Sequence, residues 1–160
     1  PIFIGIVLGI ALFVLKSMRL RMHEVGYHKV HGSLWTRESA AQDELELYPQ
    51  VLLLRFDTSL IFANADTLTE AVESHICSHA QEFKVPVRAV LLNGAGLNYL
   101  DASGVDALRE LTMHLQEKNI QLKYMLIKDS VHALMTRAHI LTDDMYIHGP
   151  HELSSWARNI

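Results

Sequence analysis

Short apolar runs alternate with segments of helical periodicity from residue 51 onward. The runs span residues 51–56, 87–93 and 120–127, and each has the length of a buried strand. Between them, apolar residues recur three or four positions apart, as they do on one face of a helix. They are Leu68, Val72, Ile76 and Ala80 in the first segment and Val105, Leu108, Leu111 and Leu115 in the second. Strands that alternate with helices predict an α/β domain with a largely parallel sheet.

Smaller elements fill the gaps between these segments. Residues 60–62 are predicted to form a second short strand after the first run. The next helix begins near Asn64, a good capping residue, or one turn later at Thr67, which opens a capping-box pattern. We also expect a short helix at 131–135 and a terminal helix that starts at Pro150.

Length, net charge and cysteine content limit the classes of protein to which the chain can belong. The chain has 160 residues, enough for one domain with a sizeable core. Its net charge of −4 argues against nucleic-acid binding, which normally needs a basic face. The single cysteine, Cys77, has no partner for an internal disulfide, which favours a reducing compartment.

Residues 1–15 carry no charged or polar side chain. A helix over them is roughly 21 Å long, shorter than the ~30 Å hydrocarbon core of a bilayer. Lys16, Arg19 and Arg21 follow the apolar run, whereas a signal peptide has its basic residues in front. Because basic residues favour the cytoplasmic side, and because the chain starts at a proline, we expect residues 1–15 to be the C-terminal part of a last transmembrane helix. A buried core helix is the alternative.

The domain plan that follows has three parts. After the apolar helix, residues 16–48 are predicted to be a cytoplasmic connector, since Gly26 and Gly32 interrupt any periodicity and residues 37–47 are mostly acidic. The folded domain then spans residues 49–160.

Ten histidines raise the question of a metal site. They include close pairs, but no pair is joined by a second cluster of ligands, as structural zinc normally requires. We therefore interpret the histidines as solvated and expect no metal. The pairs are His75 with His79, His28 with His31, and His148 with His151.

The stretch Asp101-Ala102-Ser103-Gly104 opens the second helical segment. A nucleophile elbow needs Gly-x-Ser-x-Gly, and the first glycine is missing around Ser103. Gly94 and Gly96 precede it, but they complete neither a dinucleotide fingerprint nor a phosphate-binding loop. We predict no catalytic residue and no enzymatic activity.

Ser103 has two compatible interpretations. A serine at a helix start can cap the helix. The same position offers free N–H groups and the positive end of the helix dipole to an anion, so a phosphate on Ser103 would be tolerated by the helix while repelling Asp101. The motif alone leaves both open.

This motif, together with the residues before the first helix, resembles the STAS domain. Asp101, Ser103 and Gly104 match the signature that follows a buried strand and a loop. Arg55 and the Phe62-Ala63-Asn64 sequence match the opening of the STAS domains of SulP-family anion transporters. The resemblance runs from about residue 49 to the end. The apolar helix and basic connector also resemble the passage from the last membrane helix of a SulP transporter into its cytoplasmic domain.

The resemblance implies an α/β STAS fold with a mixed sheet of about four strands and helices on one side. It also implies a regulatory domain of a secondary transporter that moves small anions, such as sulfate, bicarbonate, chloride or dicarboxylates, by symport or exchange. STAS domains are shared with anti-sigma-factor antagonists, in which the serine matching Ser103 is phosphorylated. The short segment 83–87 resembles bacterial members of the transporter family.

The resulting site prediction centres on the loop after the second strand. Ser103 is the candidate for regulatory phosphorylation, and the loop with the helix start is the candidate surface for a ligand or partner. That surface comprises Asn93, Gly94, Gly96, Asn98, Asp101 and Gly104. No cofactor is expected, although nucleotide binding has been proposed for some family members.

The resemblance also implies partners and a location. The partners would be the membrane domain of the same transporter, a second copy in a homodimer, and a cytosolic protein on the domain surface. The location would be the inner (plasma) membrane, with the domain on its cytoplasmic side. The alternative is a soluble anti-sigma-factor antagonist controlled by serine phosphorylation, which leaves residues 1–21 unexplained.

Overall fold

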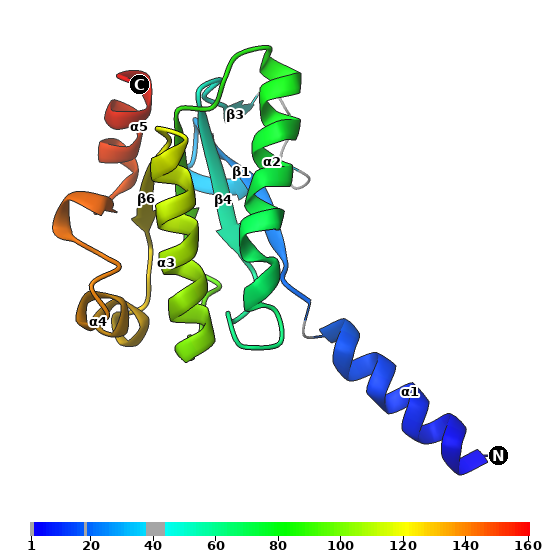
Figure 1. Ribbon diagram of the computed structural model, residues 1–160. Coiled ribbons are helices and arrows are strands. Elements are labelled where there is room, and N and C mark those ends of the chain that lie inside the picture. Colours follow the sequence, from blue (N-terminus) through cyan, green and yellow to red (C-terminus); the bar gives the residue numbers. More distant parts are fainter. Residues whose placement is uncertain (1, 18, 38–43) are drawn as a thin grey trace.

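In the computed structural model, which describes residues 2–17, 19–37 and 44–160, one mixed sheet forms the centre of the molecule (Figure 1). The order of its strands is β2-β1-β4-β5-β6-β7, with β3 paired to β1. β4 through β7 are parallel, and β1 runs antiparallel to β4. The strands are β1 (Met22–His28), β2 (Ser33–Thr36), β3 (Leu45–Glu46), β4 (Val51–Phe56), β5 (Ala89–Asn93), β6 (Gln121–Met125) and β7 (Tyr146–Ile147).

Helices cover both faces of this sheet. The helices are α1 (Ile2–Ser17), α2 (Leu68–Phe83), α3 (Ala102–Glu117), α4 (Asp129–Arg137) and α5 (Pro150–Arg158), with short 3₁₀ turns η2 (Ala65–Thr67) and η3 (Asp143–Met145). The larger core joins one sheet face to α2, α3 and α4. The smaller core joins the other face to α5 through Leu153 and Ala157. The expectation that all helices lie on one side is therefore wrong for α5.

The predicted connector contributes strands to the sheet. β1, β2 and β3 all lie within residues 16–48, so the sheet has seven strands in the described residues rather than about four. Gly26 lies inside β1 without breaking it, and a Cβ there would lie 2.9 Å from Leu47 Cδ2 and 3.1 Å from Leu45 Cβ, so these side chains would have to shift. Within the acidic stretch 37–47, residues 38–43 lie outside the described part.

Two local predictions near α2 are also wrong. Residues 60–62 form no strand, and Leu60 makes a single parallel bridge to Leu100. Neither candidate residue caps α2 with its side chain, because the 3₁₀ turn η2 leads directly into the helix. Instead, the Asn64 side chain accepts from the Ile61 N–H (2.9 Å) and donates to the Ser59 carbonyl (3.0 Å). It therefore shapes the loop before the helix.

α1 stands apart from the sheet, and large apolar side chains in its described part, among them Ile2 and Phe3, are exposed. It projects from the end of the domain at which α2 and α3 begin (Figure 1). Among the described residues, no helix combines the length and the apolarity needed to cross a membrane.

The carboxyl ends of the parallel strands lie at the same end of the domain as the start of β1. Met22 pairs with Phe56, the last residue of β4, because the two strands are antiparallel. We call this end the carboxyl edge and define it as residues 19–21, 57–67, 94–103 and 126–128. It contains most of the predicted site residues.

Candidate functional site

Asp101 ties two segments of the carboxyl edge together. Its Oδ1 accepts a hydrogen bond from the Gly104 N–H and its Oδ2 accepts one from the Phe62 N–H, both at 2.9 Å. The first bond caps α3, and the second holds the loop before α2 against the start of α3. The backbone donors of Gly104, Phe62 and Ser103 hold the pKa of the Asp101 carboxyl below its ordinary value.

Ser103 is therefore not the cap of α3. Asp101 occupies the capping position, and Ser103 is the second residue of the first helical turn, half-buried beside it. A group attached to its hydroxyl would lie at the positive end of the helix dipole and close to the Asp101 carboxylate. The position is compatible with a phosphate that competes with Asp101 for the same N–H groups.

Glycines let the loops of the edge approach one another closely. A Cβ on Gly96 would lie 2.0 Å from the Phe56 carbonyl oxygen, and one on Gly104 would lie 2.5 Å from the Leu60 carbonyl oxygen. A Cβ on Gly94 would meet Ile127 Cγ1 at 2.9 Å. These three glycines of the predicted site thus allow close packing of the loops, and they have no side chain with which to bind a ligand.

The two predicted asparagines have different roles. Asn93 is buried, and its Oδ1 accepts from the Ala95 N–H at 2.9 Å, which turns the chain after β5. Asn98 is exposed, and its Oδ1 contacts the Nζ of Lys128. Lys128 is the N-cap residue of α4, three positions after the end of β6, and it was not among the predicted site residues. Its position just after the apolar run 120–127, which predicts the neighbouring strand, is the signal that would have found it.

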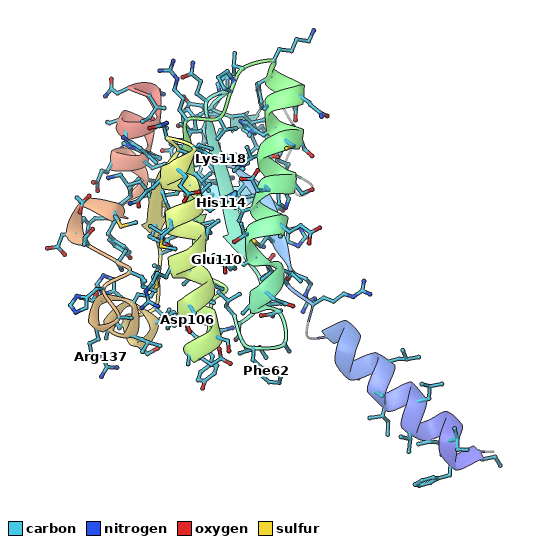
Figure 2. The ribbon with its side chains drawn as sticks, viewed as in Figure 1. Phe62, Asp106, Glu110, His114, Lys118 and Arg137 are labelled. Atoms are coloured by element: carbon cyan, nitrogen blue, oxygen red, sulfur yellow. The ribbon has the colours of Figure 1, made fainter. Side chains whose placement is uncertain are left out.

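Two exposed aromatic side chains flank the start of α3. Phe62 lies at the tip of the loop before α2, at the lower end of the domain in Figure 2. Tyr99 precedes α3, and its carbonyl accepts from the Leu60 N–H at 3.1 Å, so both aromatics lie on segments joined by backbone hydrogen bonds. Asp101, Ser103, Phe62 and Tyr99 thus lie on hydrogen-bonded segments at one end of the domain, and Lys128 joins them through Asn98.

Two of the histidines interpreted as solvated are in fact buried. The Nδ1 of His79 lies 2.8 Å from Glu24 Oε1, and its Nε2 lies 3.2 Å from the Tyr48 carbonyl oxygen. Burial raises the pKa of the Glu24 carboxyl, but the contacts with His79 and Arg37 outweigh it, and the net pKa lies below its ordinary value. This network links α2 to β1.

His28 is the second buried histidine. Its Nδ1 accepts from the N–H groups of Val30 and His31, both at 3.3 Å, and so orders the turn after β1. Within the described residues, no three potential ligands gather into a metal site.

A protein-family model matches the part of the chain that contains this loop and helix start. The STAS domain model matches residues 43–147, which include the sheet from β3 onward, the Asp101 cap and Ser103. This chain belongs to the STAS domain family. The predicted α/β STAS fold with a mixed sheet is therefore confirmed.

This STAS domain is also similar to parts of larger proteins. Over 125 residues it is 25% identical to Sulfate transporter 1.1 of Arabidopsis thaliana, a match that covers 76% of this chain and 19% of that protein. The chain thus spans about a fifth of the length of this relative.

Solved structures share the fold. The murine Solute Carrier 26 family member A9 anion transporter matches with a TM-score of 0.77 and 13% identity over 99% of this chain and 25% of that one. The unphosphorylated anti-sigma factor antagonist SpoIIAA matches with a TM-score of 0.55 and 14% identity over 72% of this chain and 94% of that one.

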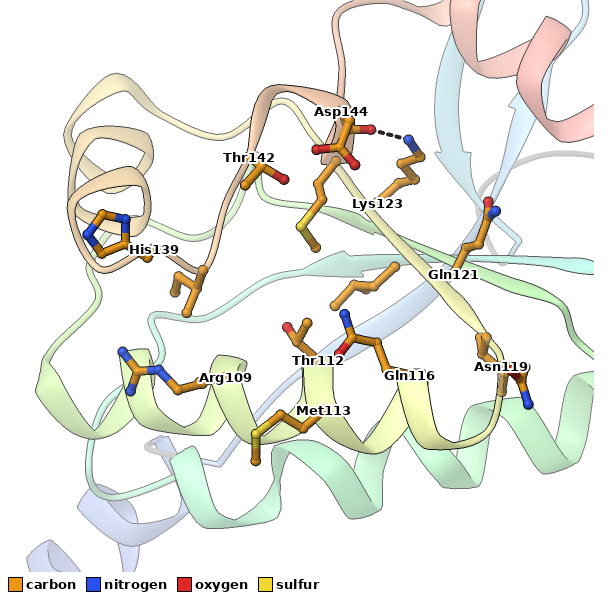
Figure 3. Close-up of a pocket in the computed structure, with 14 residues that line it drawn as sticks. Arg109, Thr112, Met113, Gln116, Asn119, Gln121, Lys123, His139, Thr142 and Asp144 are labelled. Atoms are coloured by element: carbon orange, nitrogen blue, oxygen red, sulfur yellow. Dashed lines mark hydrogen bonds between the residues drawn. The ribbon is translucent and has the colours of Figure 1, made fainter.

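A further groove in the described part of this STAS domain lies away from the carboxyl-edge loops. It has a volume of about 670 Å³ and runs between α3, β6 and the segment after α4 (Figure 3). Its cations already have acceptors: Arg109 Nη1 lies 2.6 Å from Asp106 Oδ1, and the Nζ of Lys123 contacts the Asp144 carbonyl. None of the predicted site residues lines it, so it is a separate feature.

Proposed function

We propose that this STAS domain is the cytoplasmic regulatory domain of a SulP-type anion transporter, with α1 as the C-terminal part of its last membrane helix. The observation that carries the proposal is an exposed apolar helix joined to a STAS fold by only four residues, 18–21. Its similarity to a sulfate transporter supports the same class. Arg19 and Arg21 after the helix favour the cytoplasmic side.

The regulatory step is a change of charge at Ser103. A phosphate there carries a charge of about −1.5 to −2 at neutral pH. It would repel the Asp101 carboxylate and compete for the Gly104 N–H, which weakens the bond from Phe62 to Asp101. Release of that bond frees the loop that carries Phe62, and the surface beside α3 changes shape as well as charge.

A soluble anti-sigma-factor antagonist is the second candidate. The fold match with SpoIIAA favours it, and the same Ser103 switch would serve it. It gives no role to the exposed apolar side chains of α1. Neither candidate is an enzyme, and the matched family is a transporter-associated domain rather than an enzyme class.

Anion uptake tests the proposal. Cells expressing the full-length protein are assayed with labelled sulfate, bicarbonate, chloride and a dicarboxylate, beside a variant truncated after Ser17. We expect uptake of at least one anion by the full-length protein and an altered rate for the truncated one. Absence of uptake, with the protein found in the soluble fraction, would instead support the soluble antagonist.

A further inference from the structure

Exposed apolar side chains gather at the carboxyl edge. Outside α1, the large apolar residues exposed in the described part are Val30, Phe62, Tyr99, Met113 and Leu126, and three of these five lie on the edge. Leu126 has a φ of 54°, a left-handed conformation that a bulky side chain rarely adopts. The fold thus holds an exposed leucine in a strained position directly after β6, at the same end of the sheet as the two exposed aromatics.

The segment between α1 and β1 is pinned to this edge. The Arg21 N–H donates to Thr58 Oγ1 at 3.2 Å, and the Arg21 carbonyl accepts from the Asp57 N–H at 3.0 Å. Leu20 packs against the larger core. From Ser17 to Arg21 the chain can span at most about 14 Å, even when fully extended. The end of α1 therefore cannot move far from the edge.

The charges at and beside the edge are mixed and exposed. Arg19, Arg21 and Lys128 provide cations, and Asp66 and Glu70 provide carboxylates. A hollow of about 390 Å³, lined in part by Arg19 and Glu70, opens between the linker and the start of α2. Zwitterionic phospholipid headgroups offer a phosphate and an ammonium group, which match both signs of charge.

We infer that the carboxyl edge of this STAS domain lies against the phospholipid headgroup layer of the membrane. Phe62, Tyr99 and Leu126 enter the interface, where aromatic and aliphatic side chains are favoured, and the cations face lipid phosphates. This inference rests on the proposed function, because it requires α1 to be anchored in the bilayer. It places Ser103 at the contact between domain and membrane, so a phosphate there would act on that contact.

Fluorescence quenching by labelled lipids tests the inference. A Cys77→Ser background, which removes the free exposed thiol, receives Phe62→Cys, Tyr99→Cys or Val30→Cys, and each thiol is labelled with a fluorophore. Val30 is the matched control, since it is exposed in the turn at the far end of β1, a strand of about 23 Å. The 160-residue chain is placed in phosphatidylethanolamine–phosphatidylcholine vesicles whose headgroups carry a quencher.

We expect loss of most of the fluorescence at positions 62 and 99 and little loss at position 30. Equal quenching at all three positions, in a chain that floats with the vesicles, would overturn the inference and leave the proposed function standing. A chain that does not float with vesicles would contradict the anchoring of α1, and with it both proposals. Quenching at positions 62 and 99 that disappears in the full-length protein would show that the membrane domain covers the edge instead, and would also overturn the inference.

Discussion

Replacing Gly96 by alanine tests the close packing that shapes the candidate site. The new Cβ would lie 2.0 Å from the Phe56 carbonyl oxygen, 2.9 Å from the Phe56 carbonyl carbon and 3.0 Å from the Asp57 Cα. These are backbone atoms at the end of a central strand, so they cannot rotate away as a side chain would. The loop itself must move by more than 1 Å to reach ordinary contact.

Overpacking a tight site costs about 1–3 kcal/mol, and a backbone clash belongs at the upper end of that range. At about 3 kcal/mol, a domain of this size loses roughly 6–12 °C in Tm. The assay is thermal unfolding of the 160-residue chain in a mild detergent, followed by circular dichroism and by tryptophan fluorescence from Trp35 and Trp156.

Gly149→Ala is the matched control. Gly149 has an extended backbone, and a Cβ added there would have no heavy atom within 4 Å beyond its own neighbours in the chain, so only the weak capping preference for glycine is lost. We expect a cost of no more than about 1 kcal/mol for this control. A Gly96→Ala variant that is as stable as the control would refute the close approach of the loop to β4.

Three further outcomes follow from the same contacts. Glu24→Gln removes the charged partner of His79 and should lower the free energy of unfolding by about 2 kcal/mol, measured by urea unfolding at pH 7. The cost is below that of a fully buried pair because Glu24 is partly exposed. The control Glu110→Gln, at an exposed position, should cost almost nothing. Because the folded-state pKa of Glu24 lies below its ordinary value of 4.5, its contribution is complete above that pH and is lost as the pH falls further, so Glu24→Gln should flatten the acid limb of the stability curve. Asn64→Ala leaves the Ile61 N–H without its acceptor and should lower the free energy of unfolding by about 2 kcal/mol. The control Asn98→Ala, at an exposed position, should shift the urea midpoint little. Equal shifts for the two variants would contradict the assigned role of Asn64.

The parallel centre of the sheet was predictable because β4 and β5 are buried on both sides and β6 is largely buried. The runs at 51–56, 87–93 and 120–127 are mostly apolar, and they contain β4, β5 and β6. The helices between them bury only one face, which leaves a clear periodicity. Strong burial thus made these elements visible in the sequence.

β1 and β2 were missed because their burial does not follow apolar residue types. β1 carries His23, Glu24 and His28 among its seven residues, and their side chains are satisfied by specific partners such as Arg37 and His79. When the polar side chains of a strand are paired with residues elsewhere in the fold, the strand sequence lacks the apolar alternation by which a strand is predicted. The face covered by α5 was missed for a related reason, since periodicity shows that a helix is amphipathic but not which side of the sheet it covers.

The helix start at Asp101–Gly104 was predictable from the sequence, but the capping residue was not. The sequence pattern placed Asp101 and Ser103 at the start of a helix, and the structure has them there. Which of the two caps the helix depends on backbone geometry, and the bond from Asp101 to Phe62 joins residues 39 positions apart. Such a contact, like that between Asn98 and Lys128, becomes visible only when the loops are placed together.

The most direct measurement is the initial rate of anion uptake by the full-length protein with a negative charge placed at Ser103. Ser103→Asp is compared with Ser103→Ala and with Ser155→Asp, which adds the same charge at an exposed position on α5, away from the carboxyl edge. We expect Ser103→Asp to change the rate at equal protein amounts, while Ser103→Ala and Ser155→Asp keep the wild-type rate. A Ser103→Asp variant that transports at the wild-type rate would contradict a regulatory switch at Ser103.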